Sequence, residues 1–81
     1  MQIKPLRPDL EKKLKKFALL GKYAKAKVLF ESNPRHPSLN TELLEPKEWK
    51  VYSFRIGRKY RASFIYVGQE VEVVAVTLHY Q

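Results

Sequence analysis

The strongest constraint on the fold is a change of hydrophobic period in the second half of the chain. From residue 49 onward, aromatic and β-branched residues alternate with polar ones, the pattern of half-buried β-strands. Two short turns that begin with glycine, at 57–58 and 68–69, divide this region into strands expected at 49–56, 59–67 and 70–79. Because connections this short join antiparallel neighbours, the sequence predicts a three-stranded meander.

The alternation also assigns the two faces of the sheet. Even-numbered positions should face the core: Tyr52, Phe54, Ile56, Tyr60, Ala62, Phe64, Tyr66, Val74, Val76 and Leu78. Odd-numbered positions should form an open, polar face: Ser53, Arg55, Arg61, Ser63, Thr77 and His79. Val51, Val71 and Val73 share the odd parity and are expected to be exposed unless something covers them, whereas Trp49 and Tyr52 are expected to pack. A β-bulge would reverse part of this assignment.

The first half of the chain predicts one short strand and then two helices. Pro5 confines a strand at 2–6 to a sheet edge or a strand end, and Pro8 suits the first turn of a helix. Gly21 interrupts the helical pattern, so we expect the first helix to end there and a second to occupy 22–32.

Residues 33–48 hold three prolines and are expected to form a loop. The length of 81 residues allows one domain, covering 1–81. The order of elements predicts an α+β fold, β-α-α-β-β-β, in which a helical hairpin packs on one face of an antiparallel sheet.

The charge is strongly positive and uneven. The formal net charge is +8, with +7 in residues 1–30, −2 in residues 31–48 and +3 in residues 49–81. Such a balance makes a polyanion, either nucleic acid or an acidic protein, the natural partner. The helical lysines are also what any solvated helix face would carry.

Composition excludes several kinds of chemistry. The chain has no cysteine, which rules out disulfides, zinc fingers and thiol catalysis, and His36 and His79 alone cannot form a metal cluster. We therefore expect no metal and no cofactor. The start of the chain lacks a secretion signal and no apolar run is long enough to cross a membrane, so a cytoplasmic protein without membrane contact is expected.

Four stretches of the sequence carry a resemblance to a known family. They are Asn33-Pro34-Arg35-His36-Pro37-Ser38-Leu39, Tyr52-Ser53-Phe54-Arg55-Ile56, Lys59-Tyr60-Arg61 and the ending His79-Tyr80. In this order and spacing they resemble the RelE/ParE superfamily of type II toxin–antitoxin toxins, and the His-Tyr ending is most similar to the YoeB branch. The resemblance covers nearly the whole chain and implies a RelE-like fold.

The resemblance implies a ribosome-dependent mRNA endonuclease that needs no metal and is held inactive by a small antitoxin protein. In such a reaction the RNA 2′-hydroxyl attacks the adjacent phosphate, with a base, an acid and positive charge to assist. The positions that match the family assign the phosphorane to Arg61, acid–base work to His79, and base stacking or support of His79 to Tyr80. Glu42 falls at the position of the catalytic glutamate without a gap, although Glu45 and Glu48 are close enough to compete.

Substrate contacts follow from the same resemblance. Arg55 matches a basic position on its strand, and Ser53 stands where some relatives carry a lysine, which favours a glutamate–histidine mechanism. Lysines of both helices would meet the phosphate backbone of ribosomal RNA: Lys12, Lys13, Lys15, Lys16, Lys22, Lys25 and Lys27. His36 is assigned no role.

Three alternatives remain open at this point. The chain could be a ParE-like toxin that poisons DNA gyrase, or a non-catalytic RNA-binding member of the family. Arg61 could also serve only as a surface ion-pair partner of Glu70 or Glu72 across the hairpin.

Overall fold

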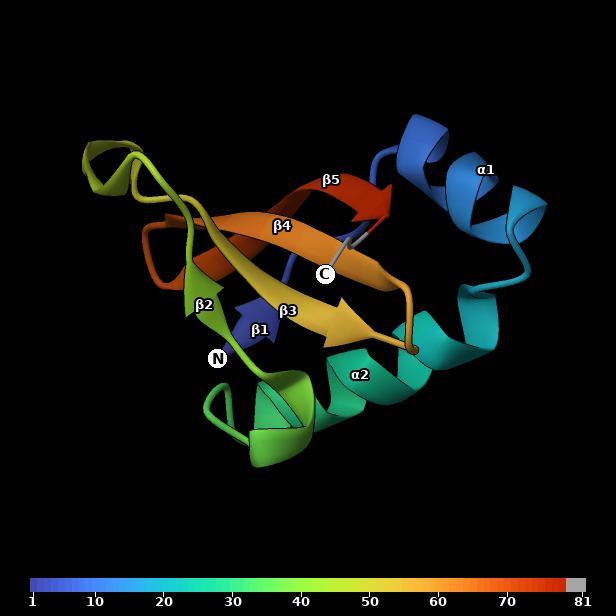
Figure 1. Ribbon diagram of the computed structural model, residues 1–81, viewed down its shortest axis with the longest axis horizontal. Helices are drawn as coiled ribbons and strands as arrows, with labels where there is room; N and C mark the ends of the chain where they lie inside the picture. Colours follow the sequence, from blue (N-terminus) through green and yellow to red (C-terminus); the bar gives the residue numbers. More distant parts are fainter. Residues whose placement is uncertain (79–81) are drawn as a thin grey trace.

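The computed structural model describes residues 1–78 and contains one five-stranded sheet and two α-helices. In chain order these are β1 (Gln2–Ile3), α1 (Pro8–Lys16), α2 (Leu20–Ser32), β2 (Glu42–Leu43), β3 (Tyr52–Ile56), β4 (Tyr60–Val67) and β5 (Glu70–Leu78). Single turns of 3-10 helix occupy Pro37–Leu39 and Lys47–Trp49. The strand order is β1-β5-β4-β3-β2 (Figure 1). The α+β class and the β3-β4-β5 meander are confirmed.

The sheet differs from the prediction at both edges. β1 pairs with β5 in parallel, so the sheet is mixed, and β2 adds a fifth strand inside the segment 33–48 that was expected to be loop. A two-residue strand is too short for its alternation to show in the sequence. The backbone of β2 is instead aligned by its pairing with β3, where Glu42 lies opposite Ser53.

A bulge in β5 reverses the faces that alternation predicted there. Ser63 lies opposite Ala75 and Phe64 lies opposite Val73, so Val74 has no residue facing it on β4. One extra residue moves the preceding odd-numbered side chains onto the core face. Val71 and Val73 are therefore buried, and the expectation that they are exposed and available to an antitoxin is wrong.

The two helices are separated at Ala18 rather than at Gly21, which lies in the first turn of α2. The amide of Leu19 donates to the carbonyl of Leu14 and that of Ala18 donates to Lys15, with Ala18 in the left-handed region at φ 57°. These are the bonds of a Schellman motif, which normally places glycine at this position. Leu14 and Leu19 are both buried, and their burial favours the motif despite the alanine.

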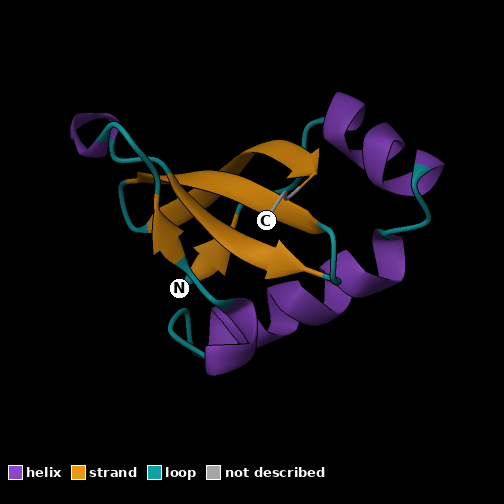
Figure 2. Ribbon diagram, in the orientation of Figure 1, coloured by secondary structure: helices purple, strands orange, loops and turns teal. Residues whose placement is uncertain are grey.

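The core lies between the helices and one face of the sheet. Figure 2 shows that neither helix crosses the front face of the sheet in this view. Three buried phenylalanines form the centre: the rings of Phe30 and Phe64 are 5.1 Å apart, those of Phe30 and Phe54 5.2 Å, and those of Phe54 and Phe64 5.7 Å. Aromatic rings at these separations bury large areas and attract one another.

The segment before β3 lies away from the core. Trp49 was expected to pack, but 73% of it is exposed, since it ends the 3-10 turn that stands out from the body at the upper left of Figure 1. Tyr52 packs against the core as expected. Within residues 1–78, no helix is long and apolar enough to cross a membrane.

Tyr23 brings a phenol into the core, and the described residues offer its hydroxyl no hydrogen-bond partner. Burial, helped by the charge of Glu31, raises the pKa of Tyr23 to about 12. Since the unfolded phenol titrates near 10, the folded state keeps a proton that the unfolded chain loses, and stability falls as the pH rises from about 10 to about 12. In the wild type the free energy of unfolding should fall by about 1.4 kcal/mol per pH unit across that window, and we expect Tyr23→Phe to abolish this fall.

The same substitution should hold or raise stability at pH 7, because it deletes an unpaired buried hydroxyl. Urea unfolding of both proteins at neutral pH and across the alkaline window measures this. All other groups are the same in both proteins, so their contributions cancel in the comparison. Identical alkaline slopes for the two proteins would contradict the assignment to Tyr23.

Candidate catalytic site

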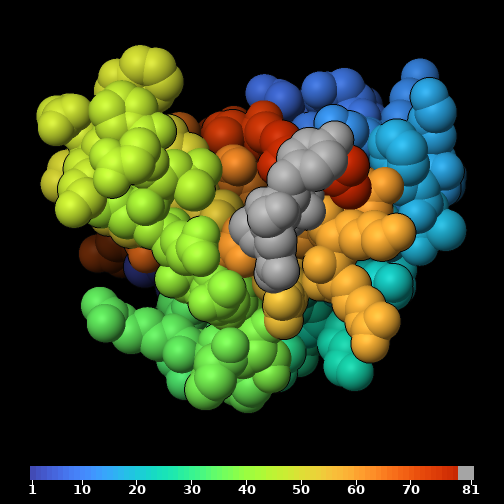
Figure 3. All heavy atoms as spheres, in the orientation of Figure 1, coloured from blue at the N-terminus to red at the C-terminus, as the bar shows by residue number. Residues whose placement is uncertain are grey.

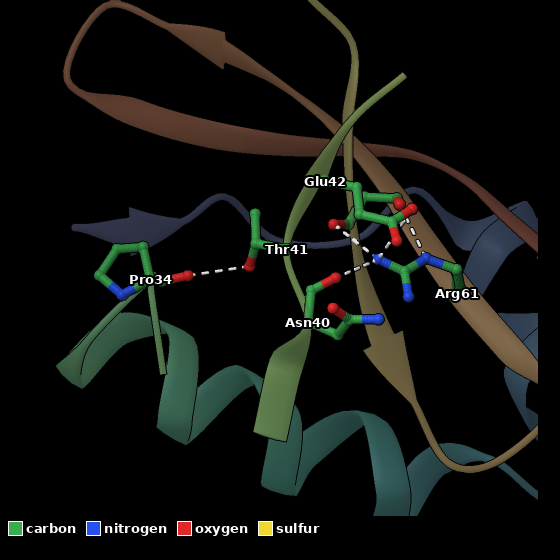
Figure 4. A network of polar contacts seen from close by, with 6 residues as sticks. Pro34, Asn40, Thr41, Glu42 and Arg61 are labelled. Carbon is green, nitrogen blue, oxygen red and sulfur yellow. Dashed lines mark hydrogen bonds and ion pairs between the residues drawn. The ribbon is translucent and has the colours of Figure 1, made fainter. Parts of the chain in front are cut away.

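Arg61 lies at the centre of a polar network on the sheet face opposite the phenylalanine cluster. It sits on β4 with only 5% of its surface exposed, and its guanidinium reaches across β3 toward β2 (Figure 4). Nε donates to Ser53 Oγ at 2.8 Å, and Nη2 donates to the carbonyl oxygens of Ser53, at 3.1 Å, and Asn40. These bonds fix the plane of the guanidinium without any charged partner at hydrogen-bond distance.

Ser53 was expected to contact substrate, but in the structure it contacts Arg61 instead. Only 1% of it is exposed, and its hydroxyl and carbonyl both accept hydrogen bonds from Arg61. A small hydroxyl at this point leaves space for the guanidinium to lie over the strand. Ser53 is therefore a positioning residue for Arg61.

The segment Asn40–Glu42 closes the network from the β2 side. Asn40 adopts the left-handed conformation with φ 45°, which asparagine tolerates better than most residues, and so turns its carbonyl toward Arg61. Thr41 Oγ1 donates to the carbonyl of Pro34 at 2.9 Å and ties the segment to the preceding loop. Asn40 acts through its backbone, so its role was missed from the sequence; its left-handed propensity was the one available signal.

Glu42 is the carboxylate that the fold brings to Arg61. Its Oε2 lies 3.9 Å from Nη2 of Arg61, and 47% of its side chain is exposed. Within residues 1–78, Arg61 makes no ion pair with Glu70 or Glu72, and Glu72 instead pairs with Lys4 at 4.0 Å. The described contacts therefore single out Glu42 among the carboxylates considered.

Burial dominates the electrostatics of Arg61. Desolvation lowers the pKa of Arg61 from its usual value, the nearby negative charge of Glu42 raises it, and the positive charge of Arg55 lowers it further. An arginine remains charged under such a shift because its reference pKa is so high. The site thus holds a fixed cation in a partly dehydrated setting, where its field acts strongly on a nearby anion.

The other predicted site residues are placed at different distances from this network. Arg55 is exposed and lies opposite Arg61 in the β3–β4 register, on the same sheet face. Lys12, Lys13 and Lys16 are exposed on α1, an element that contributes nothing to the Arg61 network. His79 and Tyr80 lie outside the residues that the structure describes.

Figure 3 shows the surface of the face that carries this network, with the segment 40–50 (yellow-green) along one side. Within residues 1–78, no group of three or more His, Cys, Asp or Glu side chains is arranged to hold a metal ion. The chemistry available from the described residues is a fixed cation and an accessible carboxylate, which together can stabilise an anion and accept a proton.

No protein-family model matches the chain, and a search of curated proteins finds no match. The function of the site therefore rests on its own residues and on the resemblance in sequence.

Proposed function

We propose that this protein is the toxin of a type II toxin–antitoxin system, a cytoplasmic RelE-like endoribonuclease that cuts mRNA on the ribosome. The observation that carries the proposal is the preorganised Arg61 guanidinium beside the exposed carboxylate of Glu42. Both positions are those that the resemblance to the RelE/ParE superfamily assigns to catalysis.

One donor of Arg61, left without a partner by residues 1–78, suits a phosphorane. Nε and Nη2 are engaged by Ser53 and Asn40, whereas the described residues supply no hydrogen-bond partner to Nη1. A guanidinium held in place by its other nitrogens can offer Nη1 to a phosphate oxygen without reorganising. The two charges that develop on the phosphorane would then be met by a cation already stripped of much of its water.

Glu42 and His79 complete the proposed reaction. The 2′-oxygen of the RNA attacks the adjacent phosphorus while Glu42 accepts the 2′-hydroxyl proton, and the bond from phosphorus to the 5′-oxygen breaks. His79 gives a proton to that 5′-oxygen, because imidazole can act as an acid near neutral pH. The products are a 2′,3′-cyclic phosphate and a 5′-hydroxyl, so the atoms and charges balance without another reactant.

The exposed carboxylate of Glu42 beside Arg61 fits a reaction that takes place on the ribosome. An enzyme with an exposed site needs its substrate to be positioned from the other side, and the ribosome would supply that second wall. A small acidic antitoxin would compete for the same positive surface.

Addition of the protein to a translation extract tests the proposal. We expect cleavage of the translated mRNA, and no cleavage of the same mRNA when ribosomes are absent. An intact mRNA together with loss of DNA supercoiling by gyrase would contradict the proposal and support a ParE-like toxin. Failure of both assays would indicate a non-catalytic RNA-binding protein.

A further inference from the structure

A second positively charged feature lies beyond the Arg61 network, at the outer edge of β3. A groove of about 500 Å³ runs between α2 and the β3–β4 turn, and the 3-10 turn Pro37–Leu39 forms its end. Figure 1 shows the β3–β4 turn lying against α2. The groove exists because β2 pairs only with the first part of β3 and leaves the remainder of that edge uncovered.

Four cationic side chains line this groove, and no acidic side chain does. Lys22 and Lys25 come from α2, while Arg55 and Arg58 come from β3 and the turn after it. All four are exposed, and among the described residues none lies within ion-pair distance of a carboxylate. Four unpaired cations repel one another, so an anion bound between the two walls would relieve an unfavourable arrangement.

The turn leaves room for one of these cations. A Cβ atom added to Gly57 would come within 2.9 Å of Cδ of Lys22, so the Lys22 side chain lies against the turn backbone. Gly57 also has φ +73°, a conformation that favours glycine. Lys22 of α2 therefore packs against the β3–β4 turn at Gly57, where there is no side chain to block it, and this contact joins the two walls of the groove.

Two structural links join the groove to the sheet face that carries Arg61. Arg55 lies opposite Arg61 in the strand register, and Leu39, on the floor, immediately precedes Asn40, whose carbonyl binds Arg61. A chain of phosphates crossing Arg61 would reach Arg55 next and then the remaining three cations. Ala26, Leu29 and Leu39 form an apolar floor, so the four cations lie at the rim of the groove, where they can contact a phosphodiester backbone.

We propose that this groove binds the phosphodiester backbone of single-stranded RNA, at phosphates beyond the one that is cut. The inference rests on the proposed function for the identity of the RNA as mRNA, but the binding itself needs no cleavage. It assigns to Lys22, Lys25 and Arg58 a defined phosphate contact, distinct from general steering by the helical lysines.

Binding of a fluorescent oligouridylate of about 12 nucleotides to the full chain, followed by anisotropy at several salt concentrations, tests the proposal. The groove variant is Lys22→Ala/Lys25→Ala. The control variant, Lys47→Ala/Lys59→Ala, removes the same charge from exposed lysines outside the groove. Because each phosphate contact contributes about 0.7 to the slope of log K against log salt, the groove variant should reduce that slope by about 1.4 and the control by far less.

Equal effects of the two variants would overturn the proposal, because they would show attraction by net charge alone. A second arm uses an oligoglutamate peptide. If the groove variant weakens peptide binding and leaves RNA binding unchanged, the groove serves an acidic protein instead and the proposal fails. The oligouridylate assay contains no ribosomes, so a wild type that binds through the groove but never cuts mRNA would sink the proposed function and leave this inference standing.

Discussion

Replacing Arg61 with alanine should lower the rate of mRNA cleavage by about 10²–10³-fold, the usual loss when one preorganised donor to a developing anion is removed. Nη1 of Arg61 is the donor that the described residues leave free, so its removal takes positive charge directly from the phosphorane. Cleavage of a reporter mRNA in a translation extract gives the rate. Arg61→Lys should recover little of it, since a lysine lacks the fork that Ser53 and Asn40 hold in place.

The control for Arg61→Ala is Lys59→Ala, which removes an exposed cation from the same hairpin. It should leave cleavage within about twofold of wild type, because exposed charges outside a site contribute little. Unfolding curves of both variants separate loss of activity from loss of fold. A folded Arg61→Ala protein that cuts mRNA at the wild-type rate would contradict the assignment of the phosphorane to Arg61.

Phe54→Ala should destabilise the protein by about 3–5 kcal/mol, the largest stability effect that we expect from a single substitution. Phe54 has no exposed surface and packs against Phe30 of α2 and Phe64 of β4, so its loss opens a cavity at the junction of helix and sheet. A domain of this size has a total stability of roughly 4–12 kcal/mol, so the variant should lose from about a quarter to all of it.

Trp49→Ala provides the matched control for that loss. Tryptophan is larger than phenylalanine, but 73% of Trp49 is exposed, and its removal should change stability by no more than about 0.5 kcal/mol. Urea unfolding at 25 °C compares the two. A small effect at Phe54 together with a large one at Trp49 would mean that the core has been assigned to the wrong aromatic residues.

The parts of the fold that the sequence predicts are those set by local pattern. The glycine turns and the apolar even positions predict β4, and β3 from Tyr52 onward, because their pairing repeats over several residues. The predicted strand began too early, at Trp49, and Tyr66, predicted to face the core, is exposed. The errors lie where tertiary contacts override a local signal. Burial of Leu14 and Leu19 places the helix break at Ala18, ahead of the glycine that propensity favours.

Two further errors depend on single residues. Val73 and Val74 are adjacent, so alternation alone does not show that the strand bulges at Val74, yet the bulge decides which of the valines in β5 are buried. β2 has only two residues, with Glu42 opposite Ser53 and Leu43 opposite Tyr52, and alternation cannot reveal so short a strand. Both features depend on pairing between strands rather than on the order of residues within one strand.

The features of the candidate site fall into the same two groups, those predicted from the sequence and those that depend on tertiary contacts. Arg61, Arg55 and Glu42 are identified by residue type and by resemblance, and the fold does bring Glu42 to within 3.9 Å of Arg61. The depth at which Arg61 lies, and its support by Ser53 and the Asn40 carbonyl, required the three-dimensional structure, because a backbone acceptor has no residue type of its own. His79 and Tyr80 stay predictions, since they lie outside the described residues.

The most direct test of the proposed chemistry is the identity of the ends that cleavage leaves on a ribosome-bound mRNA. Attack by the 2′-hydroxyl, with Arg61 on the phosphorane, predicts a 2′,3′-cyclic phosphate on one fragment and a 5′-hydroxyl on the other. Both should appear with wild type and be lost with Arg61→Ala. Fragments that end in a 3′-hydroxyl and a 5′-phosphate would contradict the mechanism, and an mRNA left whole would contradict the proposed function itself.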